Sequence, residues 1–419
     1  MNDPVQTSKS FFRSGRYILF WIGSLFSNIG AWMQQIAEPW VVLSLTNSPF
    51  WVGLDSFALN APGLLFTLLG GVLADNYDRK KVILFFQAIQ FLCVLTMILL
   101  LIAGWLKVWM IVIISFFVGL TDSLSMPAFQ SITPSLVGKK DIPKAVSLNS
   151  TQFNLSRILG PAIAGIVIVR YGALVCFSAN AVSYLPFFLS IYFIFPRGKF
   201  KTHKESIGVR PIHQLKEFKN LISNREVRNS LLIVLVTSMF CAPLITFCAV
   251  LIKNVFHAQV EHFGGAVAAF GIGGLIGASI TFITLPAYLK RNRFASILAI
   301  FLGLVIVLIA LNHSLYILIA LLVLAGAALT ASNISINTSL QEDVEENIRG
   351  RIVSLFQLAL SGGIAIGAIF TGFMVTKFNI SIALLINGII AVILQVWLLW
   401  KQFKVPVVLQ VPAVNPNAS

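Results

Sequence analysis

Long apolar runs separated by short polar segments dominate the chain. A helix that crosses the hydrocarbon core of a bilayer needs about 20 predominantly apolar residues. Twelve runs meet this requirement, and they cover residues 17–45, 50–73, 82–104, 109–133, 145–169, 172–195, 229–255, 263–289, 294–312, 314–338, 352–377 and 379–402. The pattern therefore predicts an all-α integral membrane protein with twelve transmembrane helices.

The composition favours a lipid environment. Hydrophobic residues make up 57% of the 419 residues and charged residues only 11%, whereas a soluble domain carries about 25% charged residues. The formal net charge of +15 would suit nucleic-acid binding, but so apolar a chain argues against that partner. A basic excess in a membrane protein instead marks its cytoplasmic loops.

The distribution of Lys and Arg predicts the orientation. If both termini are cytoplasmic, 25 of the 30 Lys and Arg residues lie on the cytoplasmic side, four lie outside, and Arg157 lies within a predicted helix. The positive-inside rule then favours a multi-pass protein of the cytoplasmic (inner) membrane with both termini in the cytoplasm.

The longest polar stretch divides the twelve predicted helices into six and six. We expect an N-terminal half at 1–195, a basic cytoplasmic linker at 196–228, a C-terminal half at 229–402 and a cytoplasmic tail at 403–419. The linker contains an amphipathic segment, which predicts a helix lying on the inner leaflet or a site that senses lipid or docks a partner. Its apolar side is formed by Ile212, Leu215, Phe218 and Ile222.

The two halves share residues at a constant offset. An offset of 207 positions pairs Gly119 with Gly326 and Gly160 with Gly367. Such constant spacing predicts duplication of a six-helix unit, so the halves should be pseudo-repeats. Transporters built from two parallel halves bind their substrate between them, near the midplane of the membrane.

A polar loop follows the second predicted helix, and it reads Gly71-Val-Leu-Ala-Asp75-Asn-Tyr-Asp-Arg79-Lys80-Lys81. The loop resembles motif A of the major facilitator superfamily, G-x-L-A-D-x-x-x-R-K/R-K/R. It departs from the motif at Asn76, where a basic residue is usual, and at Asp78, often glycine. The resemblance implies that Asp75 contacts the eleventh helix near Arg351 and, with the three basic residues of the loop, holds one state of a gate. A charge cluster that only sets the topology is the alternative.

Segments of the fourth and fifth predicted helices add to this resemblance. They read Pro127-Ala-Phe-Gln130, Phe153-Asn154 and Arg157-Ile-Leu-Gly160-Pro161-Ala-Ile-Ala-Gly165. They are similar to the branch of the superfamily that contains enterobactin exporters and macrolide efflux pumps. The Gly-Pro-x-x-x-Gly part is similar to motif C of drug/proton antiporters, which implies efflux. The same residues also suit close helix packing and a kink.

Four ionisable residues lie within predicted helices, all in the N-terminal half: Glu38, Asp55, Asp122 and Arg157. Each is costly in a membrane unless it is paired or hydrated. Asp122 and Arg157 have matching depths near the midplane, which predicts an ion pair. The pair either holds two helices together permanently or breaks during transport, when a proton or the substrate arrives.

Glu38 and Asp55 share a level nearer the outer surface. Glu38 continues a polar stripe with Ser24, Asn28 and Gln35, and such a stripe favours a cavity over lipid. Two carboxyl groups at one level favour retention of a shared proton, as a proton-coupling site requires. We therefore predict that these four ionisable residues form the coupling machinery, with a hydrated position at the rim as the alternative for Asp55.

The fourth predicted helix presents polar and small residues within one arc, which predicts a cavity lining. The arc contains Ser115, Gly119, Asp122, Ser123, Met126 and Gln130. We assign Asn28, Gln35 and Asn154 to the same cavity.

The chain has no phosphate-binding G-x-x-x-x-G-K-S/T motif and no nucleophile–base arrangement. We therefore expect neither an enzyme nor a cofactor, and the proton gradient as the energy source. His257, Glu261 and His262 could bind a metal, but a solvated outer loop is the simpler interpretation, so no metal site is predicted. The expected partners are a small-molecule substrate and membrane lipid, not nucleic acid, and the protein should be monomeric.

Together, the residues and the resemblance predict a proton-coupled secondary active transporter that exports a siderophore or a similar amphiphilic molecule by alternating access. A multidrug or macrolide efflux pump and an uptake permease are the main alternatives. A lipid flippase or a membrane scaffold without transport activity ranks below these. A scaffold would have no reason to keep charges inside the membrane.

Overall fold

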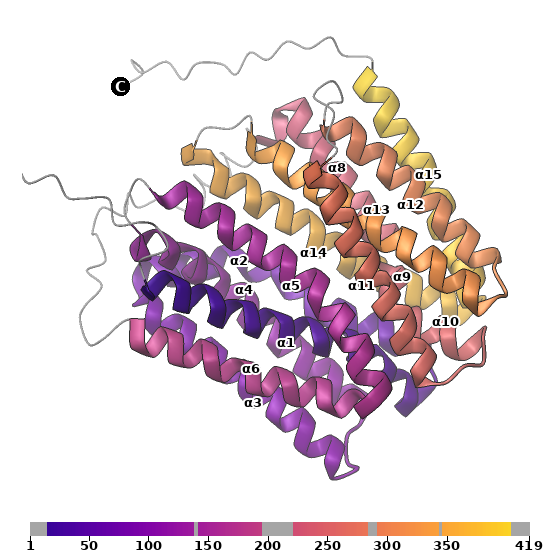
Figure 1. The fold of residues 1–419 in the computed structure, drawn as a ribbon, viewed down its shortest axis with the longest axis horizontal. Helices are drawn as coiled ribbons and strands as arrows, with labels where there is room; N and C mark the ends of the chain where they lie inside the picture. The colour runs from indigo at the N-terminus through magenta and orange to yellow at the C-terminus, as the bar shows by residue number, and fades with distance from the viewer. Residues whose placement is uncertain (1–14, 138–140, 195–220, 284–290, 343–345, 404–419) are drawn as a thin grey trace, which may run out of the picture.

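The computed structural model of the chain describes residues 15–137, 141–194, 221–283, 291–342 and 346–403, and within them the regular structure is helical (Figure 1). Ten of the described helices are long and apolar enough to cross a membrane. Two further long helices, α1 and α2, pack among them. The amphipathic linker segment around 212–218 and the tail beyond 403 lie outside the described residues.

The N-terminal half contains long helices that agree with the predicted apolar runs to within a few residues. They are α1 (Gly15–Thr46), α2 (Pro49–Asn76), α3 (Arg79–Ile102), α4 (Val108–Leu136), α5 (Ile142–Tyr171) and α6 (Ala173–Ile194). The turns between these helices contain residues that commonly begin a helix. Pro49 opens α2, where its missing N–H needs no acceptor, and the Asp78 side chain caps α3 by accepting the Lys80 N–H at 2.9 Å.

The C-terminal half differs from the prediction at its first helix. It consists of α8 (Arg225–Phe240), α9 (Pro243–Thr246), α10 (Cys248–Asn254), α11 (Val260–Ile283), α12 (Arg291–Leu311), α13 (Leu315–Glu342), α14 (Glu346–Lys377) and α15 (Ile380–Phe403). The expected continuous helix at 229–255 is broken into α8, α9 and α10. Pro243 lacks the N–H that would continue the hydrogen-bond ladder of α8, so it instead opens α9.

The expected break between the ninth and tenth apolar runs is confirmed. The Asn312 side chain accepts the Ser314 N–H at 2.9 Å and donates to the Ser314 carbonyl at 2.7 Å. This side-chain turn replaces helical hydrogen bonds and separates α12 from α13.

Glycines allow the closest helix contacts within each half. Gly119 of α4 lies against the Leu59 carbonyl of α2, and Gly326 of α13 lies against the Phe270 carbonyl of α11. These are the two glycines that the offset of 207 positions pairs in the sequence. Because no side chain separates the backbones, α2 packs on α4 and α11 packs on α13 along much of their lengths.

The two halves meet through two helix pairs, α2 with α14 and α5 with α11 (Figure 1). Gly165 of α5 lies against the Gly264 carbonyl and Ala268 of α11, and Gly53 of α2 lies against the backbone of Ala368 in α14. Small residues thus hold the halves together, as is usual where the hydrophobic effect cannot drive helix association.

The hydrophobic core divides differently at the two ends of the bundle. We name the end that carries Arg79 and Arg293 the basic end, and the end that carries Asn47 and Lys253 the opposite end. At the opposite end a single cluster of buried residues includes both halves, for example Val42 and Phe247. At the basic end each half has its own cluster, around Phe20, Ala74 and Phe187 in the N-terminal half and around Val234, Ile336 and Phe356 in the C-terminal half. Among the described residues, buried apolar packing therefore joins the halves at the opposite end, and each half has its own buried cluster at the basic end.

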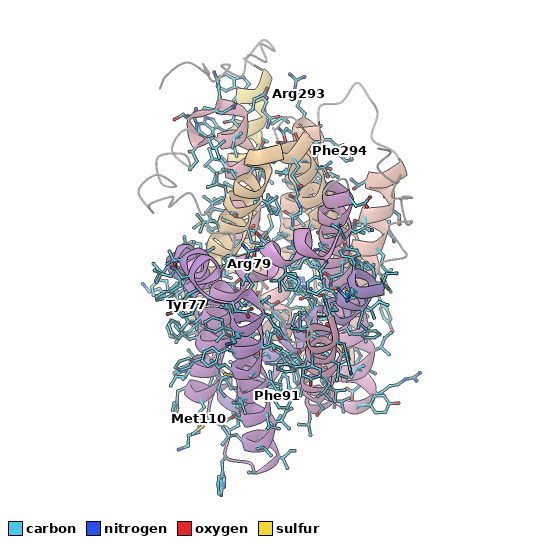
Figure 2. The ribbon with its side chains drawn as sticks, turned by 90° about the vertical axis from the view of Figure 1, so that its left-hand side faces the viewer. Tyr77, Arg79, Phe91, Met110, Arg293 and Phe294 are labelled. Carbon is cyan, nitrogen blue, oxygen red and sulfur yellow. The ribbon has the colours of Figure 1, made fainter. Side chains whose placement is uncertain are left out.

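Direct contacts also close the opposite end. The Lys253 ammonium of α10 donates a hydrogen bond of 2.6 Å to the Asn47 amide oxygen, just after α1. Trp40 of α1 stacks on Phe263 of α11, with ring centroids 5.1 Å apart and planes at 19°. At the basic end, Figure 2 shows Arg79 on the N-terminal half and Arg293 on the C-terminal half, in separate groups of helices.

Two neighbouring glycines of α11 test the packing between the halves. A methyl group on Gly264 would collide with the Gly165 carbonyl, whereas one on Gly265 meets nothing within 4 Å. We expect Gly264→Ala to destabilise the purified protein by about 1–3 kcal/mol. Gly265→Ala should be neutral or slightly stabilising, because alanine favours a helix. Thermal unfolding in detergent measures both, and equal melting temperatures would contradict the close contact.

Candidate functional site

A pair of buried carboxyl groups lies where α1, α2 and α4 meet. Glu38 of α1 and Asp55 of α2 are 5% and 6% exposed, and their carboxyl groups interact directly with each other. The Ser115 hydroxyl of α4 donates a hydrogen bond of 2.6 Å to Glu38 Oε1. Three helices thus bring these side chains together, and the structure confirms that the two carboxyls lie at one level.

A chain of amides extends this site to α6. Gln34 Nε2 lies 3.4 Å from Glu38 Oε2, to which it donates from one turn earlier in α1. Asn180 Nδ2 of α6 in turn donates to Gln34 Oε1 at 2.7 Å, and the Ser183 hydroxyl lies 3.4 Å from Asn180 Oδ1. Each amide accepts from one side and donates to the other, so the orientation of every group depends on its neighbour.

The carboxyl pair has no basic partner among the described residues. The groups that interact with Glu38 and Asp55 are each other, Ser115 and Gln34. One oxygen of Asp55, Oδ1, is buried without a hydrogen-bond partner among the described residues. Two negative charges in contact in a dry environment would repel strongly, so a proton on one of the carboxyls stabilises the arrangement. This arrangement is chemically suited to binding and releasing a proton.

The predicted polar stripe of α1 is divided between different neighbours. Asn28 Nδ2 donates to Gln152 Oε1 of α5 at 3.4 Å, and the Ser24 hydroxyl bonds to the Phe20 carbonyl of its own helix. Gln35 is half-buried and Glu38 belongs to the carboxyl pair. The stripe therefore faces protein, and part of it serves helix packing.

Asp122 and Arg157 do not form the predicted ion pair. Each lies near the middle of its helix, α4 or α5, so their matching depths are as expected. The Arg157 guanidinium instead lies over the ring of Trp32 in α1, 5.8 Å from its centroid. Asp122 is exposed and has no ion pair with a described residue. The prediction failed because depth alone does not say which way a side chain points around its helix.

The remaining predicted cavity residues fall into two groups. Met126 is half-buried and Gln130 is exposed, and both follow Asp122 along α4. Asn154 is half-buried on α5.

The antiporter-like glycines have clear packing roles. Gly160 leaves room for Trp32 of α1, while Gly165 contacts α11 of the other half. Pro161 lies inside α5, next to Gly160.

Two of the three basic residues of the motif A-like loop contact their own half, and Lys81 is exposed. Arg79 donates to the Ser131 carbonyl of α4 at 3.1 Å, and the Lys80 ammonium lies 5.6 Å from the ring centroid of Tyr192 in α6. Gly71 of α2 has open space where a side chain would be. The side chains of Asp75 and Arg351 lie outside the described part of the chain, so the predicted contact between them stays a prediction.

Among the described residues, no group of three His, Cys, Asp or Glu side chains could hold a metal ion. This search includes His257, Glu261 and His262 near the start of α11.

Sequence reasoning missed the amides of the carboxyl site. Gln34 precedes Glu38 by four residues, so the two share a helix face, and this spacing was a usable signal. The sequence signal for Asn180 was weaker, because it consisted only of a single amide side chain in an apolar helix. Nothing in the sequence indicated that α6 would place Asn180 against α1.

These features define a class of protein: a multi-pass helical membrane protein with a buried pair of carboxyl groups in its N-terminal part. The profile of the major facilitator family described as transmembrane secretion effectors matches residues 6–417. The chain belongs to this family.

Relatives of known name align over nearly the whole chain. The staphyloferrin A transporter of Staphylococcus aureus is 27% identical over 390 residues, covering 90% of this chain and 92% of that protein. The multidrug efflux pump Tap of Mycolicibacterium fortuitum is 24% identical, covering 91% and 96%. Macrolide efflux protein A of Streptococcus pyogenes is 21% identical, covering 91% and 94%.

Solved structures share the fold. The nucleoside transporter NupG superposes with a TM-score of 0.68 at 15% identity, covering 94% of this chain and 100% of that chain. A bacterial homologue of the lysosomal transporter Spinster, in an inward-facing and occupied conformation, gives a TM-score of 0.67 at 14% identity, covering 93% and 96%.

The separation of Asp122 from Arg157 leads to a double-mutant test. Without an ion pair, the stability losses of Asp122→Asn and Arg157→Gln should add in the double variant to within about 0.5 kcal/mol. Melting temperatures of the purified proteins in detergent provide the measurement. A double variant clearly more stable than the sum of the single losses would show that the two charges meet.

Proposed function

We propose that the chain is a proton-coupled exporter that works by alternating access, with two six-helix halves as its moving parts. The observation that carries this proposal is the buried Glu38–Asp55 pair, two carboxyl groups in contact with no basic partner among the described residues. Such a pair gains stability from a proton and loses it when both groups ionise. A transporter can couple that exchange to its change of shape.

The transport cycle follows from the two ends of the bundle. By the positive-inside rule the basic end faces the cytoplasm, so the separated halves admit a substrate from inside. Substrate loading accompanies release of a proton from the carboxyl pair. The halves then rock, the contacts at the opposite end part, and substrate leaves while the pair takes up a proton from outside.

The motif A-like loop is proposed as the latch of the other state. In the present arrangement Arg79 and Lys80 are bound within the N-terminal half. When the basic end closes, Asp75 would approach the start of α14 and stabilise the positive end of that helix dipole. The loop would then hold the cytoplasmic side shut while the opposite side is open.

A siderophore is the proposed substrate. The staphyloferrin A transporter, a relative along almost the full length, supports this choice. The pump Tap and macrolide efflux protein A support drug export as the second candidate. Uptake, lipid flipping and a scaffold role have no comparable support. We further propose a monomer of the cytoplasmic membrane that uses no cofactor.

Secretion by living cells tests the substrate. A strain that lacks this chain should release less siderophore under iron limitation and accumulate it inside, and the wild-type gene should restore release. Mass spectrometry of medium and cell extracts makes the comparison. An unchanged siderophore profile together with raised sensitivity to macrolides would instead support the drug-export candidate.

Glu38→Gln tests the coupling, with the compound found by that comparison as substrate. Glutamine keeps the shape and hydrogen bonds but cannot exchange a proton, so export against a gradient should stop while downhill counterflow continues. Reconstituted vesicles with an internal pH dye measure substrate and proton movement together. Glu261→Gln, at an exposed site in α11, is the matched control and should export normally. Proton movement in the Glu38 variant equal to wild type would exclude Glu38 as the coupling residue.

A further inference from the structure

Arg157 occupies a face of α5 that is turned toward the interior between the halves. Ser156 and Gly160 face α1, where Ser156 Oγ lies 3.5 Å from the Leu25 carbonyl and Gly160 contacts Trp32. Ile158 and Gly165 face α11 of the other half. At 100° per residue, Arg157 lies between these two faces. The far side of α5 carries the exposed apolar side chains of Ile163 and Ile166, so the guanidinium is directed toward the space between α1 and α11.

Aromatic rings form the wall behind this guanidinium. The Arg157 guanidinium lies 5.8 Å from the ring centroid of Trp32, and Trp32 meets the ring of Phe153 edge-on, with centroids 6.4 Å apart at 66°. Gly160 provides the room for Trp32, since a side chain there would collide with it. The cation is therefore held on one side by an aromatic surface that leaves its N–H donors free to bind another group.

No described residue accepts a hydrogen bond from the Arg157 side chain or pairs with its charge. Asp122 is the one acidic residue at matching depth, and it forms no ion pair with Arg157. The apolar runs of the C-terminal half contain no acidic residue near the midplane. A guanidinium inside a membrane protein without an acceptor is costly, so an anion that binds there gains the interactions that the protein does not supply.

We propose that Arg157, Trp32 and Phe153 form a recognition site for a carboxylate of the exported molecule. The planar guanidinium matches a carboxylate with two parallel hydrogen bonds, and the two rings suit an adjoining apolar or aromatic part. The site selects an amphiphilic anion over a cation of the same size. This inference rests on the proposed function only in that the ligand is the transported compound; the binding itself needs no proton gradient.

A matched pair of small probes tests the charge preference. Naphthalene-2-carboxylate and naphthalene-2-carboxamide share a ring system and differ in the charge of one group. Bidentate pairing to a cation predicts that purified wild-type protein binds the carboxylate about tenfold or more tighter than the amide. Titration calorimetry in detergent, without a membrane potential, measures both. Equal affinities, or tighter binding of the amide, would overturn the proposal.

Variants assign the preference to Arg157. Arg157→Gln should bring carboxylate binding to the level of the amide, and Arg157→Lys should keep part of the preference, because lysine retains the charge without the planar fork. Asp122→Asn should strengthen carboxylate binding by removing a like charge. Arg170→Gln, at an exposed position of the same helix, is the control and should bind as wild type.

These outcomes separate the inference from the proposed function. A carboxylate preference that persists in Arg157→Gln would place the site elsewhere and overturn the inference, even if export is proton-coupled. A preference for naphthalen-2-ylmethylammonium over the carboxylate would identify Asp122 as the recognition group and overturn it as well. If Glu38→Gln loses proton coupling but keeps the Arg157-dependent preference for the carboxylate, the result would support both the proposed function and the carboxylate site.

Discussion

A carboxyl group inside an apolar helix bundle needs hydrogen-bond donors or a proton, and this requirement organises the N-terminal half. Ser115 and Gln34 donate to Glu38, and Asn180 orients Gln34. These bonds tie α1, α4 and α6 together around one acidic group, and α2 adds Asp55. The polar contacts that stabilise the packing are therefore the same contacts that surround the proposed proton site, so in the proposed cycle a change of protonation would alter how these helices fit together.

The distribution of the hydrophobic core is compatible with the proposed movement of the halves. Each half keeps its own cluster at the basic end, while one cluster joins them at the opposite end. The small residues between α5 and α11, such as Gly165 and Gly264, let the backbones approach without interlocking side chains. Two bodies that meet along smooth surfaces can rock against each other while their internal packing stays intact.

The proposed coupling and recognition groups occupy different places in the same half. The Glu38–Asp55 pair is enclosed by α1, α2 and α4, whereas Arg157 of α5 lies over the ring of Trp32. Trp32 and Gln34 lie close together on α1, so one helix contributes to both sites. A shift of α1 on protonation would move the aromatic wall behind Arg157, which gives the two proposed sites a direct mechanical connection.

Much of the fold could be read from the sequence, because lipid imposes a simple rule on length and polarity. Apolar runs gave the helices, and intramembrane charges identified Glu38, Asp55, Asp122 and Arg157 as unusual, since each is costly in hydrocarbon. Depth along a helix follows from residue number, and it correctly placed Glu38 and Asp55 at one level. The partner of a side chain also depends on rotation about the helix axis and on which helix lies next to it. Only the tertiary structure decided these rotations and neighbours. It placed Arg157 against Trp32 and not against Asp122, and it brought Asn180 to Gln34. It also divided the seventh predicted helix at Pro243.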